Sequence, residues 1–322
     1  MNVQKIFTRI LEGNMPDSEI QEFLLELKKQ GETSEDITYA AQALLDVATP
    51  FPKPDYLFAD LVGTGGDEQG TYNISTAATF VAAAMGLPMA KHGNRSVSSR
   101  CGSADVLISL GANLEMSPEQ SRACLDRTGF CFLLAPVYHP GMRHAMKVRR
   151  ALHTRTIFNL LGPLVNPAHP SVQLTGVYDP KWCRPVAETL QKLGAQRTLV
   201  VHGSGLDEIA IHGPTQGALL NDGVIEEFVW EPFQSYSLDS IKGGEPDQNA
   251  EWLVKLLKGQ ASDAQVEAVA VNAGSLLWLA GDKISDISAR KLACEQARDL
   301  IQSGKAYDTL DAFISYSRIQ TA

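Results

Sequence analysis

The stretch DLVGTGGDEQGTYNISTAA, residues 60–78, is the first candidate for chemistry. Its glycines follow an apolar run and precede a predicted helix, so free backbone N–H groups and the positive end of the helix dipole could bind an anion such as phosphate. Asp67 and Glu68 should repel phosphate, however, and the stretch has neither the lysine of a P-loop nor the third glycine of a dinucleotide-binding loop. Taken alone, it is more typical of a plain strand-to-helix turn.

The stretch KHGNRSVSSRCGSAD, residues 91–105, follows another predicted strand and is rich in hydrogen-bond donors. These donors are Lys91, Asn94, Arg95, Ser98, Ser99 and Ser103. In open α/β sheets the carboxyl ends of the strands line the ligand crevice, so both stretches can face one site. His92 by itself would more often be a packed histidine than a catalyst, but the cluster as a whole favours phosphate binding.

The stretch VHGSGLDE places Asp207 and Glu208 just after a third predicted strand. The two carboxylates could supply a general base, form an ordinary exposed turn, or bind a hard cation. Mg²⁺ prefers oxygen ligands and typically links one or two carboxylates to substrate phosphates. A divalent metal between the acids and the anion would explain why acids stand beside a phosphate loop, and it predicts that the anion is a diphosphate. Asp67 could then orient its loop or bind a sugar hydroxyl or a metal-bound water.

The predicted helix 140–152 carries one arginine on its apolar side. A stripe typical of solvent exposure contains Arg143, Lys147 and Arg150. The opposite face contains Met142, Ala145, Met146 and Leu152, with Arg149 in its middle. Because an unpaired buried charge is costly, Arg149 needs an anionic partner. The sequence leaves open whether this partner is a buried acid or the carboxylate of a ligand.

Charge and composition restrict the class of protein. The net charge of −9 argues against a general nucleic-acid or membrane-surface binder. Residues 69–104 and 127–178 nevertheless contain no acid, which favours a local positive site for an anionic small molecule over chance clustering. Five cysteines without a C-x-x-C pair, together with the absence of a signal-peptide pattern or a membrane-spanning apolar run, predict a cytoplasmic protein.

The elements that must position these residues alternate along most of the chain. Helices are predicted at 3–12, 17–30, 34–48, 75–85, 102–110, 118–128, 140–152, 181–193, 263–279, 285–303 and 308–316, with Thr33 as the N-cap of the helix 34–48. Strands are predicted at 56–62, 87–90, 130–135, 172–178 and 197–202, and Asn221-Asp222-Gly223 predicts a hairpin turn. The spaced prolines of TPFPKPDY indicate an extended linker after the first three helices. The pattern predicts an α/β fold with a mainly parallel central sheet flanked by helices.

Together these stretches resemble the anthranilate phosphoribosyltransferase family. The matching motifs are DLVGTGGD, TYNIST, KHGNRSVSS, GSADVL, VRRAL..RTIFNLLGPLVNPA, GVY and VHGSGLDE, which follow the family's order and spacing over residues 60–208. The resemblance implies transfer of phosphoribosyl from 5-phosphoribosyl-1-diphosphate (PRPP) to the amine of anthranilate, with Mg²⁺. It also implies a small all-helical domain, residues 1–53, that forms a homodimer contact and is joined in space by the segment 139–160. Residues 54–322 would form the α/β domain.

The resemblance also assigns residues. The donor PRPP would be held by Gly63, Gly66, Asp67, Thr71, Asn73, Ser75, Thr76, Lys91, Asn94, Ser99 and Ser103. Anthranilate would contact Gly63, Asn94 and Arg149, with His92 and His139 nearby, and Mg²⁺ would bind Ser75, Asp207 and Glu208. Lys91, with the metal bound by Asp207 and Glu208, would stabilise the leaving diphosphate.

Two departures from the family pattern, His153 and Ile108, look structural. The alternatives are a pyrimidine-nucleoside phosphorylase, which should not need the LDE pair, and a non-catalytic nucleic-acid-binding relative, which the net charge and the complete site oppose.

Overall fold

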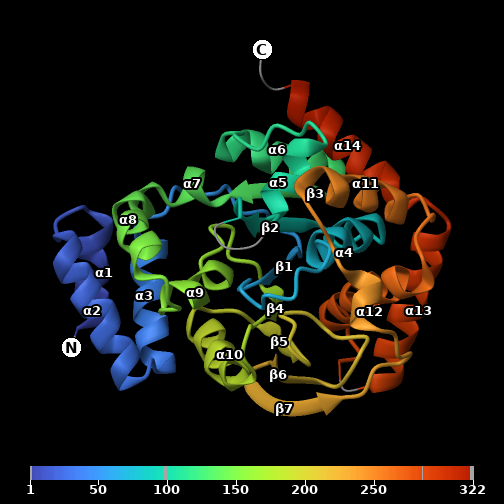
Figure 1. Cartoon of the computed structure of the whole chain (residues 1–322). Helices are drawn as coiled ribbons and strands as arrows, with labels where there is room; N and C mark the ends of the chain where they lie inside the picture. Colours follow the sequence, from blue (N-terminus) through green and yellow to red (C-terminus); the bar gives the residue numbers. More distant parts are fainter. Residues whose placement is uncertain (1, 97–99, 285, 320–322) are drawn as a thin grey trace.

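The computed structural model of the chain describes residues 2–96, 100–284 and 286–319. The first three helices, α1 (Val3–Leu11), α2 (Asp17–Gln30) and α3 (Ser34–Asp46), form a group at one side of the molecule (Figure 1). The predicted cap at Thr33 is confirmed, since its hydroxyl accepts from the Asp36 backbone N–H and the Asp36 carboxylate accepts from Thr33 in return. This capping box fixes where α3 begins.

A seven-stranded sheet occupies the centre of the larger body, in the order β3-β2-β1-β4-β5-β6-β7. The strands are β1 (Ala59–Gly63), β2 (Met89–Gly93), β3 (Phe130–Leu134), β4 (Val172–Gly176), β5 (Arg197–Gly203), β6 (Thr215–Asn221) and β7 (Val224–Trp230). The first five strands of that order are parallel, and β6 and β7 add an antiparallel hairpin. The mainly parallel sheet and the hairpin turn at Asp222-Gly223, both with positive φ, are confirmed.

Helices cover both faces of the sheet (Figure 1). The helices that follow the N-terminal group along the chain are α4 (Ile74–Ala84), α5 (Ser103–Ser109), α6 (Pro118–Thr128), α7 (Ala135–Tyr138), α8 (Arg143–Leu152), α9 (Phe158–Leu161), α10 (Cys183–Lys192), α11 (Pro246–Leu257), α12 (Asp263–Ala280), α13 (Ile287–Gln302) and α14 (Ala306–Ile319). Side chains alternate along β5: Leu199 and Val201 pack in the core shared with α12, whereas Val200 packs in the core shared with α10 and the N-terminal helices. The strand therefore joins two apolar cores, one on each face.

Several predicted bounds differ from the structure. Strand β1 begins at Ala59 rather than residue 56, because the proline-spaced linker before it is extended but lies outside the ladder. The predicted helix 140–152 starts with a 3₁₀ turn, Pro140–Met142, before α8. Helix α11 was not predicted, although Pro246 follows its N-cap Glu245, a signal typical of a helix start.

Helix α8 belongs in space to the N-terminal helices. It packs against α1 and α2, and Ala145 and Val148 on its inner side are buried in the same core as Phe7 of α1. The segment around 139–160 thus connects the helical group to the sheet, while a domain boundary at residue 53 stays a prediction. Among the residues that the structure describes, no helix has both the length and the apolar character needed to cross a membrane.

Candidate active site

The predicted site residues meet at the carboxyl ends of the parallel strands. The loop 64–73 leads from β1 into α4, Asn94 follows β2, and Asp207 and Glu208 follow β5. Because these strands are parallel, their carboxyl ends lie along one edge of the sheet, which is where ligands bind in open α/β folds. Ser99, and with it Ser98, lies outside the described residues.

Asp207 is held against the ends of β1 and β4. The backbone N–H of Gly65 donates to Asp207 Oδ2 at 2.6 Å. A Cβ on Gly63 would lie 2.2 Å from that same oxygen, and a Cβ on Gly176 would lie 1.5 Å from the Asp207 carbonyl oxygen. Both positions therefore require glycine, because any side chain would displace the acidic loop.

Glu208 faces the start of α4 and is only 8% exposed. Its Oε1 accepts from the backbone N–H of Ser75 at 3.1 Å, so the helix N-terminus stabilises the carboxylate. Its Oε2 is buried and has no hydrogen-bond partner among the residues that the structure describes. A buried carboxylate oxygen without a partner is costly, and it marks a place where a cation or a donor is expected.

The acids near Glu208 create an excess of negative charge. Burial, and then the neighbouring Asp67, raise the pKa of Asp207 to about 7. Burial, and then Asp207, raise the pKa of Glu208 well above its usual range, and burial raises that of Asp67. Within the described ranges no three His, Cys, Asp or Glu side chains converge as a complete metal site. These acids therefore fit a metal such as Mg²⁺ that takes its other oxygens from substrate phosphates and water.

Lys91 is buried at the edge of this acidic region, with its side chain ammonium donating to the Leu61 carbonyl oxygen at 2.6 Å. Burial lowers the pKa of Lys91, and the attraction of nearby carboxylates opposes that shift. In order of effect these carboxylates belong to Asp60, Glu208 and Asp207. Lys91 forms no ion pair with any acid in the described part of the chain, so its charge is available to an anion.

His92 and His139 are buried side by side, with ring centroids 5.3 Å apart. Nδ1 of His92 lies 3.1 Å from the Gly162 carbonyl oxygen, and Nε2 of His139 lies 2.7 Å from that of Val165. Because a carbonyl only accepts, each of these nitrogens carries the proton and the second nitrogen of each ring keeps a lone pair. Burial lowers the pKa of His92 to about 3 and also lowers that of His139, so both rings are neutral.

Arg149 lies half-buried on α8, with its guanidinium carbon 5.1 Å from the centroid of the Phe158 ring. Burial lowers the pKa of Arg149, and no carboxylate of the described residues pairs with it. Within those residues the structure shows no buried acid as its partner, and a ligand carboxylate as the partner stays a prediction. The predicted solvent stripe of Arg143, Lys147 and Arg150 is exposed, as expected.

The other predicted donor residues line the start of α4 and its neighbours. Thr71 pairs with Lys242 in an isolated bridge, Asn73 caps α4, and Thr76 Oγ1 is buried without a partner among the described residues. Gly66 adopts a φ of 77°, Asn94 Oδ1 accepts from the Arg95 backbone N–H at 2.8 Å, and Ser103 begins α5 beside Gly93. The described donor residues therefore lie in the loop after β1, at the start of α4, after β2 and at the start of α5.

Sequence reasoning missed the residues that brace the glycine loop. Arg155 donates to the Gly66 carbonyl oxygen and pairs with Glu68, and Lys242 Nζ donates to the Gln69 carbonyl oxygen at 2.6 Å. Another brace is Asn249, whose Nδ2 donates to Asn73 Oδ1 at 2.9 Å. Arg155 belonged to the acid-free stretch, but nothing in the sequence indicated that Lys242 or Asn249 would lie here.

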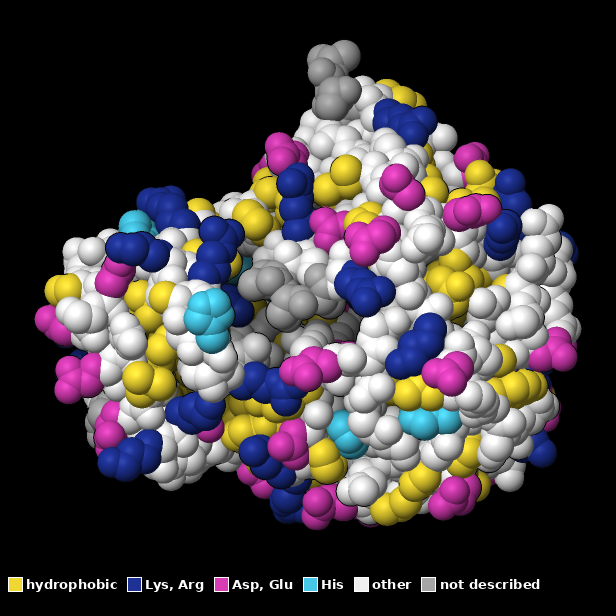
Figure 2. Space-filling model, in the orientation of Figure 1, with side chains coloured by type: hydrophobic (Ala, Val, Ile, Leu, Met, Phe, Trp, Pro, Cys, Tyr) yellow, Lys and Arg dark blue, Asp and Glu magenta, His cyan; other side chains and the backbone are white. Residues whose placement is uncertain are grey.

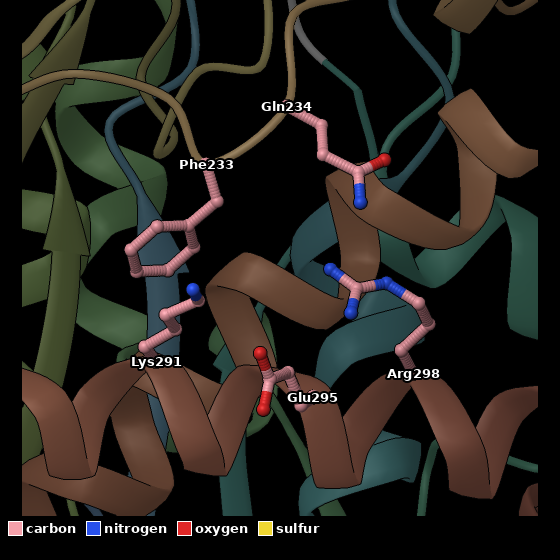
Figure 3. A pocket seen from close by; sticks show the side chains of 5 residues that line it. All are labelled: Phe233, Gln234, Lys291, Glu295 and Arg298. Carbon is pink, nitrogen blue, oxygen red and sulfur yellow. The ribbon is translucent and has the colours of Figure 1, made fainter.

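The surface supports an anion site between the two parts of the molecule. Figure 2 shows Lys and Arg side chains gathered where the N-terminal helical group meets the larger body. By contrast, a hollow of about 170 Å³ beside α13 is lined by side chains of mixed charge (Figure 3). These are Phe233, Gln234, Lys291, Glu295 and Arg298. Arg298 is already paired with the buried Glu267, and none of these residues follows a strand that carries the site.

Comparison with known proteins decides the family. Residues 55–307 match the model described as "Glycosyl transferase family, a/b domain". An anthranilate phosphoribosyltransferase of Vibrio vulnificus is 50% identical over 318 residues, which cover 98% of this chain and 94% of that protein. The chain belongs to the anthranilate phosphoribosyltransferase family.

Solved structures of the family agree with this fold. The anthranilate phosphoribosyltransferase of Thermus thermophilus matches with a TM-score of 0.91 at 38% identity, covering 98% of this chain and 94% of that one. The Saccharomyces cerevisiae anthranilate phosphoribosyltransferase, in complex with PRPP and Mg, matches with a TM-score of 0.86 at 28% identity, covering 98% and 93%. The predicted pentosyl-transferring enzyme and the α/β fold with an N-terminal helical part are confirmed, and the phosphorylase and nucleic-acid-binding alternatives are not favoured.

The raised pKa of Asp207 predicts how the stability of this chain depends on pH. The folded chain holds the Asp207 proton more tightly than the unfolded chain, whose carboxyl has a pKa near 3.8. The contribution of Asp207 to the free energy of unfolding therefore falls as pH rises from about 4 to about 7. Asp207→Asn removes this loss, and since one pKa unit corresponds to about 1.4 kcal/mol, the variant should gain a few kcal/mol over wild type at pH 8.

Urea unfolding at pH 5 and pH 8 with a chelator present measures this difference. The exposed Asp299 on α13 is the matched control, and Asp299→Asn should follow the wild-type curve at both pH values. If the free energy of unfolding had the same pH dependence in wild type and Asp207→Asn, ionisation of Asp207 would not destabilise the fold.

Proposed function

We propose that this enzyme binds PRPP with Mg²⁺ between the glycine loop, the start of α4 and the Asp207–Glu208 pair, and that it transfers the phosphoribosyl group to anthranilate bound near Arg149. The observation that carries this proposal is the buried Oε2 of Glu208 beside the N-terminus of α4, which has no hydrogen-bond partner among the described residues. A helix N-terminus favours the phosphates, while the acids favour the cation that accompanies them. The yeast relative crystallised with PRPP and Mg supports the same pairing.

Different residues of the chain would bind different parts of the donor. Asp207 and Glu208, with Ser75, would hold Mg²⁺, which when bound stabilises negative charge on the leaving diphosphate. Lys91, whose ammonium has no acid partner among the described residues, adds a second positive charge at that position. The loop from Gly63 to Thr71 supplies backbone N–H groups, because positive φ at Gly65 and Gly66 lets the chain turn tightly around the anion.

The acceptor is positioned rather than deprotonated. Anthranilate carries a carboxylate beside an aromatic amine, and the unpaired guanidinium of Arg149 fits that carboxylate. His92 and His139 are neutral and present lone pairs, so they can accept from the amine without adding positive charge near the reacting carbon. Correct orientation of a weak nucleophile supplies a large part of such a rate enhancement. No residue is assigned as the general base.

We expect Arg149→Ala to raise the KM for anthranilate far more than the KM for PRPP. Loss of a charge-assisted hydrogen bond costs about 1.5 to 3 kcal/mol, roughly ten- to a hundredfold in affinity. Steady-state kinetics with each substrate varied in turn measures both constants. Arg150→Ala, one position along on the exposed side of α8, is the matched control and should change neither. Equal changes for both substrates after Arg149→Ala would indicate a structural role instead.

Glu208→Gln keeps the size of the side chain and removes the charge that would hold the metal. We expect the rate at saturating substrates to fall by orders of magnitude at ordinary Mg²⁺ and the Mg²⁺ concentration for half-maximal rate to rise. Rates across a Mg²⁺ titration test this. Glu68→Gln, an exposed acid in the glycine loop, should keep the wild-type dependence. A general base would lower the rate of Glu208→Gln without shifting its metal dependence.

We further propose that the helical group forms the contact of a homodimer. Leu25, Tyr39 and Val47 on α2, α3 and the turn after it are each more than 40% exposed, and a second copy of the chain could cover these apolar side chains. Sedimentation at micromolar concentration should give twice the chain mass, and Tyr39→Glu should lower it. A monomeric wild type would contradict the proposal.

We also infer a cytoplasmic location. All five cysteines are free, and Cys124, Cys131, Cys183 and Cys294 are buried. A chain that keeps every thiol unpaired fits a reducing compartment. Fractionation of cells that express the chain with its own N-terminus would test this, and recovery in a secreted or periplasmic fraction would contradict it.

A further inference from the structure

Asp60 is a fully buried acid that the proposed mechanism does not use. It is the second residue of β1 and is 0% exposed. Its Oδ2 accepts from Asn166 Nδ2 at 2.8 Å and, more weakly, from the His92 backbone N–H at 3.4 Å. Its Oδ1 has no partner among the residues that the structure describes. Because Asp60 is fully buried, it cannot contact a substrate. It could affect the reaction only through a neighbouring residue.

The neighbour that matters is Lys91. Its ammonium donates to the carbonyl oxygen of Leu61, the residue directly after Asp60, so the two charges lie beside the same segment of β1. Asp60 is the carboxylate that most favours the charged form of Lys91, and Lys91 is the group that most favours the charged form of Asp60. Each is buried, and a buried charge needs an opposite charge to remain in place.

The other acids near Lys91 do not serve this purpose when the donor is bound. Glu208 and Asp207 also attract Lys91, but in the proposed complex their charge is balanced by Mg²⁺. Asp60 is fully buried on the interior strand β1 and accepts a hydrogen bond from Asn166, so in that complex it remains the carboxylate that opposes the charge of Lys91. Asn166 is itself fixed, because Nδ2 also donates to the Ala90 carbonyl oxygen at 2.9 Å and Oδ1 accepts from the Ala168 backbone N–H.

We propose that Asp60 is a positioning residue of the donor site, and that its carboxylate, oriented by Asn166, is the buried counter-charge that holds the Lys91 ammonium where the leaving diphosphate binds. This inference rests on the proposed role of Lys91 toward the diphosphate. Asp60 would thus affect the donor site without contacting the substrate. Its partner Asn166 would link the segment 162–168 to that site.

A double-mutant cycle tests whether Asp60 acts through Lys91. We expect Asp60→Asn to lower kcat/KM for PRPP about ten- to a hundredfold in the wild-type background and less than about threefold in the Lys91→Met background. Urea unfolding gives a second readout: Lys91→Met alone leaves the Asp60 charge unbalanced and lowers the midpoint, and adding Asp60→Asn should raise it again. The proposal would be overturned if Asp60→Asn lowered kcat/KM for PRPP by the same factor in both backgrounds and if the two substitutions had additive effects on the urea midpoint.

Gln173 provides the matched control. It is the register partner of Asp60 on β4, is buried, and donates to the Pro163 carbonyl oxygen at 2.6 Å, so it contacts the same segment without facing Lys91. Gln173→Ala should have the same effect on kcat/KM in both backgrounds. If that effect also vanished in Lys91→Met, the coupling of Asp60 would be nonspecific and the proposal would fail.

Two other results, a variant that does not fold and a Lys91 without effect on PRPP, can be distinguished from failure of the proposal. If Asp60→Asn does not fold, Asn166→Ser removes the bond that orients the carboxylate and runs the same cycle, with the same expected non-additivity. If Lys91→Met leaves the kinetics with PRPP unchanged, the proposed role of Lys91 fails, and the unfolding cycle alone then decides whether Asp60 and Lys91 are coupled.

Discussion

The structure of the site depends on two adjacent carboxylates, the half-buried Asp207 and the buried Glu208, which follow β5 at the carboxyl ends of the parallel strands. Glycine at 63 and 176 lets Asp207 approach the ends of β1 and β4. One oxygen of Glu208 accepts a hydrogen bond from a backbone N–H at the start of α4. Burial makes this pair costly in the free enzyme, as the raised pKa of both groups indicates. We propose that the metal ion bound with the donor offsets this cost.

The same logic extends to the other charged groups. Arg149 is half-buried without an acid partner in the described part of the chain, and Lys91 donates only to a backbone carbonyl there. The site thus contains ionisable groups of both signs that form no direct ion pair with one another in the described part of the chain. In the proposed complex, the metal, the diphosphate and the anthranilate carboxylate would pair with these groups, so that binding and catalysis would draw on the same preorganised charges. In the further proposal, Asp60 supports this arrangement from a buried position behind Lys91.

Much of this could be predicted from the sequence where the information is local. The capping box at Thr33, the hairpin at Asp222-Gly223 and the alternation of strands and helices depend on near neighbours, and each was confirmed. Parallel strands also bring their loops to one edge, so the meeting of Asp207 with Gly65 followed from topology. The pairing of Asp60 with Asn166, 106 residues apart, could not be predicted, because no pattern in either segment specifies the other. For the same reason, the contact of Lys242 with the glycine loop could not be predicted from the sequence.

Proton release on donor binding tests the central claim most directly. Calorimetry of PRPP with Mg²⁺ titrated into the enzyme near pH 7, in two buffers with different ionisation enthalpies, measures the protons exchanged. Because Asp207 has a pKa near 7 and that of Glu208 is raised well above its usual range, these carboxyls hold protons in the free enzyme and should lose them when the metal binds. The account predicts net proton release beyond that from mixing Mg²⁺ with PRPP alone, and smaller release in Glu208→Gln. Binding with no excess release would contradict it.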